Sequence, residues 1–202
     1  MFSKISAALL ALALTIPQAG AEIDFTPTET EYSAEGFTYR QVTLKDGEGR
    51  VIFTPPHHWV VRGNKDRMQL TSPDKSFAEA TIQAVPLSAS QPFDEAAERA
   101  FEEQVIRAAP PGSQSVQIVK REQNPIVMAQ HLSYGVVISY QALGQTFHRS
   151  MVFVNCPGAQ LILRFTAPKA DFDALNADFV RSMTSWQWIN KPAASNTAVA
   201  SK

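Results

Sequence analysis

Alternating apolar and polar residues predict most of the regular structure between residues 36 and 189. Period-two stretches in the first half indicate strands over 37–44, 51–53, 59–61, 68–71 and 78–85. Those in the second half indicate strands over 116–121, 126–132, 136–142, 146–154 and 161–166. Turn residues such as Asp46-Gly47-Glu48-Gly49 separate neighbouring strands. Because the connections are short, the sheet is predicted to be mainly antiparallel.

Two segments have the 3.6-residue period of amphipathic helices. The first is predicted to begin near Pro92, whose ring presets a first-turn backbone angle, with Ser90 as a candidate cap. Its apolar face consists of Phe93, Ala97, Ala100, Phe101 and Val105. The second is predicted to begin near Ala170 or Asp171, and Trp186 and Trp188 are expected to fasten its exit to the body. Its apolar face consists of Phe172, Leu175, Phe179, Val180 and Met183. Runs of strands with only two helices predict an α+β fold rather than an alternating α/β fold.

The first 21 residues have the three-part pattern of a secretory signal peptide. Lys4 precedes a twelve-residue apolar stretch, and Ala19 and Ala21 place small residues before a cleavage site at Glu22. Twelve residues rise only about 18 Å as a helix, whereas the bilayer core is about 30 Å thick. We therefore expect cleavage of residues 1–21 rather than a membrane anchor. The mature chain is then predicted to be periplasmic, with full secretion as the alternative.

Cleavage would leave 181 of the 202 residues, which suits a single domain with one core. Residues 22–35 are polar and are predicted to be a lead-in segment, followed by one α+β domain over 36–189. Residues 190–202 are rich in Ala, Ser and Thr and contain no aromatic residue. This tail is expected to be disordered, because it offers too little apolar surface to bury.

Charge and cysteine content exclude several classes of protein. The chain has 18 basic and 19 acidic residues, and because Lys4 is the only charge in 1–21, the mature net charge would be −2. This balance gives no electrostatic reason to expect a nucleic-acid or anionic-membrane partner. Cys156 is the single cysteine, so no intrachain disulfide can form, which argues against a small disulfide-rich toxin. A lone turn cysteine without a flanking base is expected to be inert.

The histidines offer two candidate chemistries. His57 and His58 are adjacent, and adjacent residues on a strand point to opposite faces, so they could share a metal only in an irregular loop. No Cys, Asp or Glu lies close in sequence to complete the set. The alternative is a loop histidine packed beside Trp59. His148 and Ser150 share one face of a predicted strand, the minimum for a base and a nucleophilic serine, but no Gly-x-Ser-x-Gly elbow is present.

Polar residues alternate with apolar ones along several predicted strands. A partly wet sheet face is expected to carry Thr81, Gln83, Ser139, Gln141, His148 and Arg164. A solvated back face is the simple interpretation, because antiparallel sheets often have one. The alternative is a shallow binding surface of mainly neutral polar groups. No phosphate-binding loop and no redox Cys-x-x-Cys occurs in the sequence, so no cofactor is expected.

The run Phe53-Thr54-Pro55-Pro56-His57-His58-Trp59 resembles the opening of PsbP-like domains. The later part of the chain is also similar, with a strand ending near Ser72-Pro73, the strand over 78–85, an amphipathic helix, an antiparallel meander and a closing helix. The resemblance spans roughly residues 37–188. It implies an α/β/α sandwich, in which two main helices flank a central antiparallel sheet, and a non-catalytic domain that binds a partner. It brings no catalytic residue, and a fold does not fix a function.

These observations predict an exported, non-enzymatic binding module that engages a protein partner. Two alternatives remain open. The first is a small-ligand or metal-binding periplasmic protein that uses the wet sheet face or the His57–His58 loop. The second is a hydrolase that uses His148 with Ser150.

Overall fold

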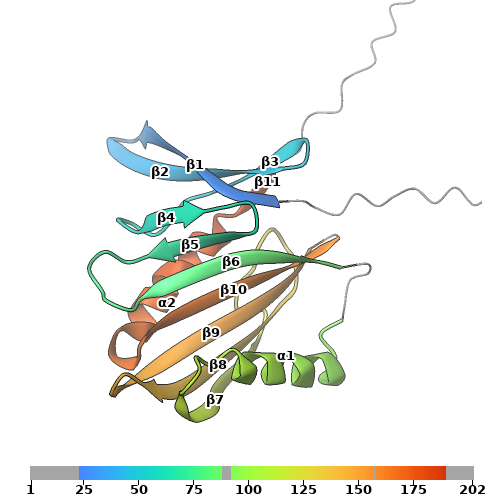
Figure 1. Cartoon of the computed structure of the whole chain (residues 1–202). Helices are drawn as coiled ribbons and strands as arrows, with labels where there is room; N and C mark the ends of the chain where they lie inside the picture. Colours follow the sequence, from blue (N-terminus) through green and yellow to red (C-terminus); the bar gives the residue numbers. More distant parts are fainter. Residues whose placement is uncertain (1–22, 88–91, 157, 190–202) are drawn as a thin grey trace, which may run out of the picture.

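A computed structural model describes residues 23–87, 92–156 and 158–189. Within these ranges the chain forms eleven strands and two helices, α1 (Glu95–Arg107) and α2 (Lys169–Thr184) (Figure 1). Neither helix is long and apolar enough to cross a membrane. The predicted signal peptide and tail lie outside the described residues, so both remain predictions.

The described strands form two sheets. The small sheet has the order β1-β2-β3-β11, with strands Ile23–Ala34, Phe37–Asp46, Gly49–Phe53 and Gln187–Ile189. The large sheet has the order β4-β5-β6-β10-β9-β8-β7. In chain order its strands are Val60–Gly63, Arg67–Thr71, Glu79–Pro86, Gln114–Gln123, Ser133–Ala142, Gln145–Cys156 and Ala159–Pro168.

Every pairing between these strands is antiparallel, which confirms the predicted α+β class with mainly antiparallel strands. The expectation of one central sheet needs correction, because the chain divides its strands between two. Short turns predict which strands are antiparallel, but they do not show where one sheet ends and the next begins.

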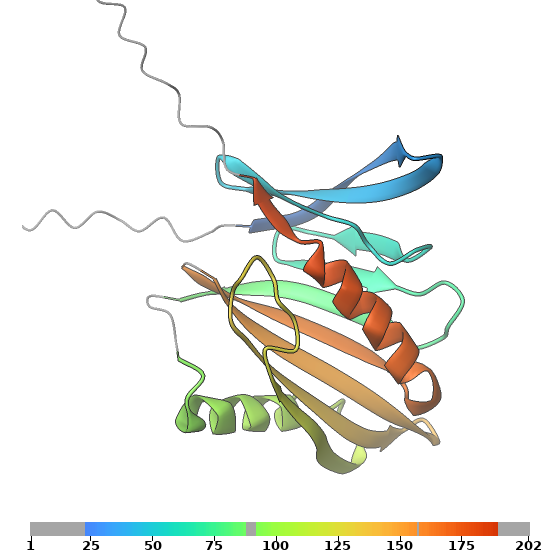
Figure 2. The same cartoon turned by 180° about the vertical axis from the view of Figure 1, so that it is seen from behind.

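The two helices lie on opposite faces of the large sheet (Figures 1 and 2). Phe101 of α1 stacks on Phe153 at 4.3 Å between ring centroids, and Phe153 is the register partner of Ile162 on β10. Phe179 of α2 stacks on Phe165 of the same strand at 5.9 Å. Because side chains alternate along a strand, positions 162 and 165 point to opposite faces. We call these faces the α1 face and the α2 face.

The chain returns from α2 to the small sheet through two tryptophans. Trp186 is fully buried and stacks on Phe53 of β3 at 5.4 Å, and Trp188 meets Trp186 edge-on at 5.9 Å. Strand β11 then pairs with β3. The predicted fastening of the helix exit by Trp186 and Trp188 is confirmed.

The first helix begins later than its sequence pattern suggests. Asp94 is the N-cap, and its carboxylate accepts a hydrogen bond from the backbone N–H of Ala97 at 2.9 Å. Pro92 therefore lies before the helix, and the candidate cap Ser90 lies outside the described residues. An aspartate three residues before a free backbone N–H satisfies that donor directly, which explains why the helix begins here.

Two segments of the fold correct the sequence prediction. The predicted lead-in segment over 22–35 is strand β1 from residue 23 onward, paired with β2. It buries Ile23 and Phe25, and half of its remaining residues are Thr or Glu, so the alternation is weak. The predicted strand over 126–132 is a loop with one bridge, between Met128 and His131. Ile126 and Met128 both point into the core, which imitates a strand pattern without a partner strand.

Candidate functional site

The six polar residues predicted to share a wet face are divided between the two faces of the large sheet. Arg164 is the register partner of Thr81, and Gln83 that of Ile162, which places all three on the α1 face. Ser139 is the register partner of His148, which pairs in turn with Ala167 on the α2 face. Gln141 lies two residues beyond Ser139 and shares its face. The six therefore do not form one surface.

On the α2 face, packing removes much of the expected polar surface. Ser139 and Ser150 are buried, and the ring of His148 packs edge-on against Phe172 of α2 at 5.2 Å. Burial lowers the pKa of His148, with a further contribution from Lys169. Among the described residues no hydrogen bond joins His148 to Ser150. The pair therefore lacks the contact through which a base activates a serine.

Cys156 is enclosed at the end of β9. Its thiol is buried, and its sulfur lies 3.9 Å from the carbonyl oxygen of Val154. Burial raises the pKa of Cys156 to about 12. The reactive thiolate is therefore essentially absent at neutral pH, in agreement with the inert cysteine expected from the sequence.

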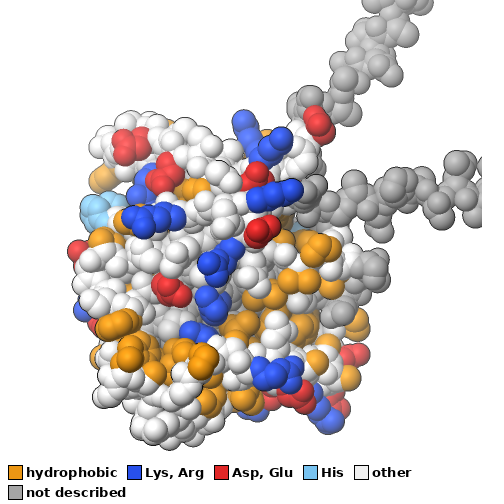
Figure 3. Space-filling view, viewed as in Figure 1, with side chains coloured by type: hydrophobic (Ala, Val, Ile, Leu, Met, Phe, Trp, Pro, Cys, Tyr) orange, Lys and Arg blue, Asp and Glu red, His pale blue; other side chains and the backbone are white. Residues whose placement is uncertain are grey.

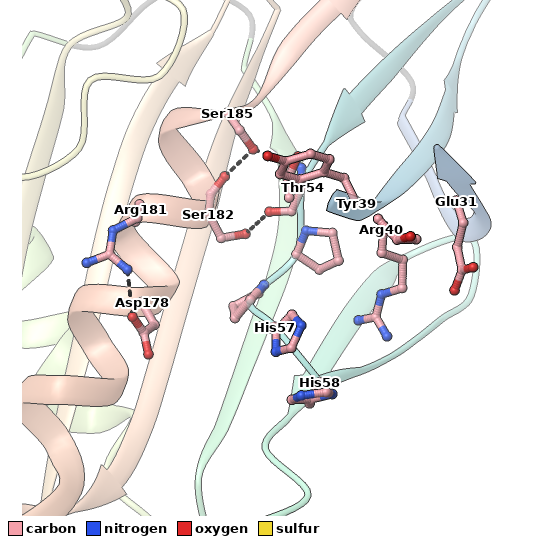
Figure 4. A pocket seen from close by; sticks show the side chains of 13 residues that line it. Glu31, Tyr39, Arg40, Thr54, His57, His58, Asp178, Arg181, Ser182 and Ser185 are labelled. Carbon is pink, nitrogen blue, oxygen red and sulfur yellow. Dashed lines mark hydrogen bonds and ion pairs between the residues drawn. The ribbon is translucent and has the colours of Figure 1, made fainter. Parts of the chain in front are cut away.

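His57 and His58 lie in a cleft between the β1–β2 hairpin and the end of α2 (Figure 4). The cleft has a volume of about 710 Å³. His58 has a left-handed backbone (φ 63°), and the two ring centroids are 3.7 Å apart. The turn is therefore the irregular loop that a shared metal would require. No group of three or more His, Cys, Asp or Glu among the described residues is arranged to hold a metal ion, so metal binding stays a prediction.

Most other polar groups of this cleft are already bonded within the protein. Arg40 forms an ion pair with Glu29 at 3.2 Å and donates to the carbonyl of Trp59. Arg181 forms an ion pair with Asp178 at 2.8 Å. Ser182 donates to the carbonyl of Thr54 at 2.7 Å, and the Thr54 N–H donates to the hydroxyl of Ser185 at 2.8 Å. The cleft thus balances its own charges and offers few free polar groups.

The α1 face of the large sheet is only half covered. Helix α1 packs on β7 and β8, and the apolar cluster beneath it extends to Ile162 of β10. Strands β4, β5 and β6, with the part of β10 around Arg164, carry no layer on this side (Figure 1). We call this uncovered half the open face. One cross-strand row on it consists of Arg62, Gln69, Thr81 and Arg164. In the next row Arg67 pairs with Gln83. Basic side chains accordingly gather over the middle of this surface (Figure 3).

Acidic groups do not balance the charge of the open face. Glu79 is the only carboxylate in these and the adjoining row; it accepts from Gln69 at 2.8 Å and lies 3.8 Å from Arg164. Arg62 and Arg67 are exposed and form no ion pair with any described residue. The open face is therefore locally basic, although the whole chain has a net charge of −1.

An apolar pocket of about 340 Å³ borders the open face. Its lining consists of Phe77, Glu79, Pro110, Pro111, Tyr140, Ala142, Leu143, Phe147 and Thr166. Phe77 and Leu143 are 58% and 78% exposed, and both have a left-handed backbone, with φ values of 66° and 50°. Such φ values are rare for bulky residues and cost stability. At Leu143 the hairpin accounts for it, because Leu143 and Gly144 are the two central residues of the turn between β8 and β9, where a type I′ turn has positive φ at both positions. Phe77 is not in a two-residue hairpin turn, and its ring packs edge-on against Phe147 at the pocket.

A buried arginine separates the covered half from the open face. Arg149 is 7% exposed; its Nε donates to Thr166 Oγ1 at 2.9 Å, and its guanidinium donates to the carbonyl of Ala108, the C-cap of α1. The guanidinium also lies 5.5 Å from the centroid of the Tyr140 ring. Burial lowers the pKa of Arg149, and no described carboxylate forms an ion pair with it. The carbonyl at the C-terminal end of α1 and the face of the Tyr140 ring take the place of an anion.

The sequence prediction identified three residues of the open face and missed others. It included Thr81, Gln83 and Arg164 but not Arg62, Arg67 or the exposed Phe77. Arg62 and Arg67 lie one position outside the predicted strands 59–61 and 68–71. Extending the alternation by one residue at each strand would have placed both arginines opposite the core face.

No family model and no curated protein matches the chain. Solved structures similar to it include the cyanobacterial PsbP of Synechocystis, with a TM-score of 0.47 and 9% identity. That match covers 87% of this chain and 98% of the PsbP chain. PsbP gives its name to the family that the sequence resembles.

Two further solved structures have comparable similarity. LpqN, described as involved in cell envelope biogenesis of Mycobacterium tuberculosis, has a TM-score of 0.46 and 14% identity, over 81% of this chain and 91% of its own. A Pseudomonas aeruginosa protein of unknown function has a TM-score of 0.44 and 16% identity, over 82% of this chain and 99% of its own. At such scores and identities these likenesses bring no activity, ligand or partner to this chain.

Proposed function

We propose that this chain is an exported, non-enzymatic module that binds a protein partner through its open face. The observation that supports this most is the combination of unpaired guanidinium groups and an exposed apolar pocket on one half-covered sheet face. Exposed apolar surface bordered by polar residues is typical of interaction sites. Arginine and aromatic residues are also the types that contribute most to binding energy at interfaces.

The proposal includes the compartment and the finer fold assignment. The pattern of residues 1–21 supports export, with the periplasm as the expected compartment. The large sheet with α1 and α2 on its two faces is compatible with the α/β/α sandwich of PsbP-like domains. The small sheet would then be an addition beside that sandwich.

Site-specific photo-crosslinking in the native host tests this function. A photoreactive amino acid in place of Gln83, in the middle of the open face, is expected to give a discrete adduct with one envelope protein. The matched control places the same group at Ala174, which is exposed on α2 at the opposite side of the large sheet. Absence of an adduct from position 83, or the same adducts from both positions, would contradict the proposal.

A second candidate function is binding of a metal ion or small ligand at the His57–His58 cleft. The observation in its favour is the irregular turn, which brings both exposed rings to one side. Two imidazoles provide half of a tetrahedral zinc set, so water would have to complete it and affinity would be modest. Calorimetric titration with Zn²⁺ is expected to show a single site that His57→Ala and His58→Ala each remove. If zinc still binds after both substitutions, its site does not involve His57 or His58.

A further inference from the structure

The chemistry of the open face narrows the class of partner. We propose that this face binds an extended acidic segment of a protein, in which alternate carboxylates meet the arginines and one bulky apolar side chain enters the adjoining pocket. This inference rests on the proposed function of partner binding and specifies what the partner must present.

The spacing of the arginines suits an extended segment that crosses the strands. Arg62 on β4 and Arg164 on β10 belong to one cross-strand row, three strand spacings apart. At about 4.8 Å per spacing, their Cα atoms lie about 14 Å from each other. An extended chain covers this distance in about four residues, and its alternate side chains point to one side. Arg67 lies between them, one row further along β5.

The groups between the arginines favour a peptide over a lipid surface. Gln69 and Gln83 are half-buried amides on the open face, and Thr71 adds a hydroxyl in the adjoining row. Amides and hydroxyls both donate and accept, so they can bond the N–H and C=O groups of an extended backbone. An anionic bilayer needs mainly positive charge, and this chain has a net charge of −1.

The apolar pocket lies next to the arginine row. Glu79 and Thr166 line the pocket and are register partners, one row away from Thr81 and Arg164. That step along a strand is about 6.7 Å. A segment whose carboxylate meets Arg164 can therefore place a neighbouring side chain in the pocket. A volume of about 340 Å³ accommodates one side chain of the size of Phe or Leu.

Selection from random peptides tests the inference without assuming a partner. The exported chain is immobilised and panned against displayed linear peptides of about twelve residues, long enough to cross the face when extended. Enriched sequences are expected to contain acids at alternate positions and a single Phe, Leu or Trp. The synthetic form of an enriched peptide should bind the double variant Arg62→Gln/Arg67→Gln about tenfold more weakly. Phe77→Ala should weaken it as well, whereas Arg99→Gln, on the exposed surface of α1, should not.

Three results would overturn the inference: no enrichment, enrichment of neutral or basic sequences, or equal affinity for the parent chain and the double variant. Binding to phosphatidylglycerol vesicles that the double variant loses would assign the face to a membrane instead. The crosslink from position 83 separates the two proposals. If it persists while the peptide result is negative, partner binding stands and the acidic segment is wrong. If both are absent, both proposals are wrong.

Discussion

The two halves of the α1 face belong to one sheet but differ in what covers them. Beneath α1 the face is apolar and buried, with Tyr134, Val136, Ile138 and Phe153 at its centre. Over β4, β5 and β6 the same face presents arginines and amides to solvent. The transition takes place within β10, where Ile162 belongs to the buried cluster and Arg164, two residues later, belongs to the open face. The first half stabilises the fold, whereas the second is the surface for which we propose a binding partner.

The largest expected effect lies in the covered half. Phe101→Ala removes a ring that stacks on Phe153 at the centre of the α1 contact. We expect the free energy of unfolding to fall by about 3–5 kcal/mol, measured by urea denaturation. The matched change Arg62→Ala on the open face should stay within about 0.5 kcal/mol. Comparable losses from both variants would show that the open face also belongs to the folding core.

The next effect lies at the border between the halves. Thr166→Val keeps the shape of the side chain but removes the acceptor for Nε of the buried Arg149. We expect a loss of about 1–3 kcal/mol in the free energy of unfolding, because a buried charged donor is left unsatisfied. Thr71→Val, in the same cross-strand row but half-exposed, is the control and should change little. Equal effects would mean that Arg149 does not depend on Thr166.

The opposite face provides a pH-dependent comparison. Burial holds the pKa of His148 below 6.5 in the folded chain, so the unfolded chain binds its proton more tightly. Stability is therefore expected to fall as the pH drops from about 7.5 to about 5.5, because the unfolded chain takes up this proton first. His131 is shifted in the same direction by burial. Urea midpoints of His148→Asn should show a shallower decline, and an unchanged decline would remove His148 as a cause.

The smallest effect concerns the strained aromatic of the open face. Phe77→Asn is expected to raise the free energy of unfolding by about 0.5 kcal/mol, because asparagine tolerates a left-handed backbone better. Phe77→Ala serves as the control, since it removes the ring but retains the unfavourable φ. Thermal unfolding should rank the asparagine variant above the alanine variant. The reverse order would mean that the backbone at position 77 is not strained.

The sequence predicted local structure better than the assembly of the sheets. Alternation placed the strands around Val42, Leu70 and Ile82, because each has a core side and a solvent side. It failed for β1, whose buried Ile23 and Phe25 are followed by a polar run, and for the loop after Pro125, whose buried side chains imitate a strand. Alternation along a strand shows that its side chains point to two opposite sides. It does not show which strand lies next to it in the sheet, because that depends on hydrogen bonding to a segment elsewhere in the chain.

The candidate site was harder to predict for the same reason. Thr81 and Ser139 are both polar residues between apolar neighbours in a strand, yet they lie on opposite faces of the large sheet. The face of each depends on the register between strands that are distant in sequence. The left-handed Phe77 has no local marker, since neither glycine nor asparagine stands there. By contrast, the side-by-side placement of His57 and His58 depends only on an irregular turn, which the two preceding prolines already indicate.

The pairing of β11 with β3 has a consequence for biosynthesis. A chain leaves the ribosome from its N-terminus, so β1, β2 and β3 emerge long before their last neighbour at residues 187–189. Until then β3 has an unpaired edge, and Phe53 lacks the ring of Trp186. An open strand edge beside uncovered aromatic surface is prone to aggregation, against which chaperones protect. The small sheet is thus completed only when residues 187–189 are available, so β3 keeps an open edge through most of the synthesis of the chain.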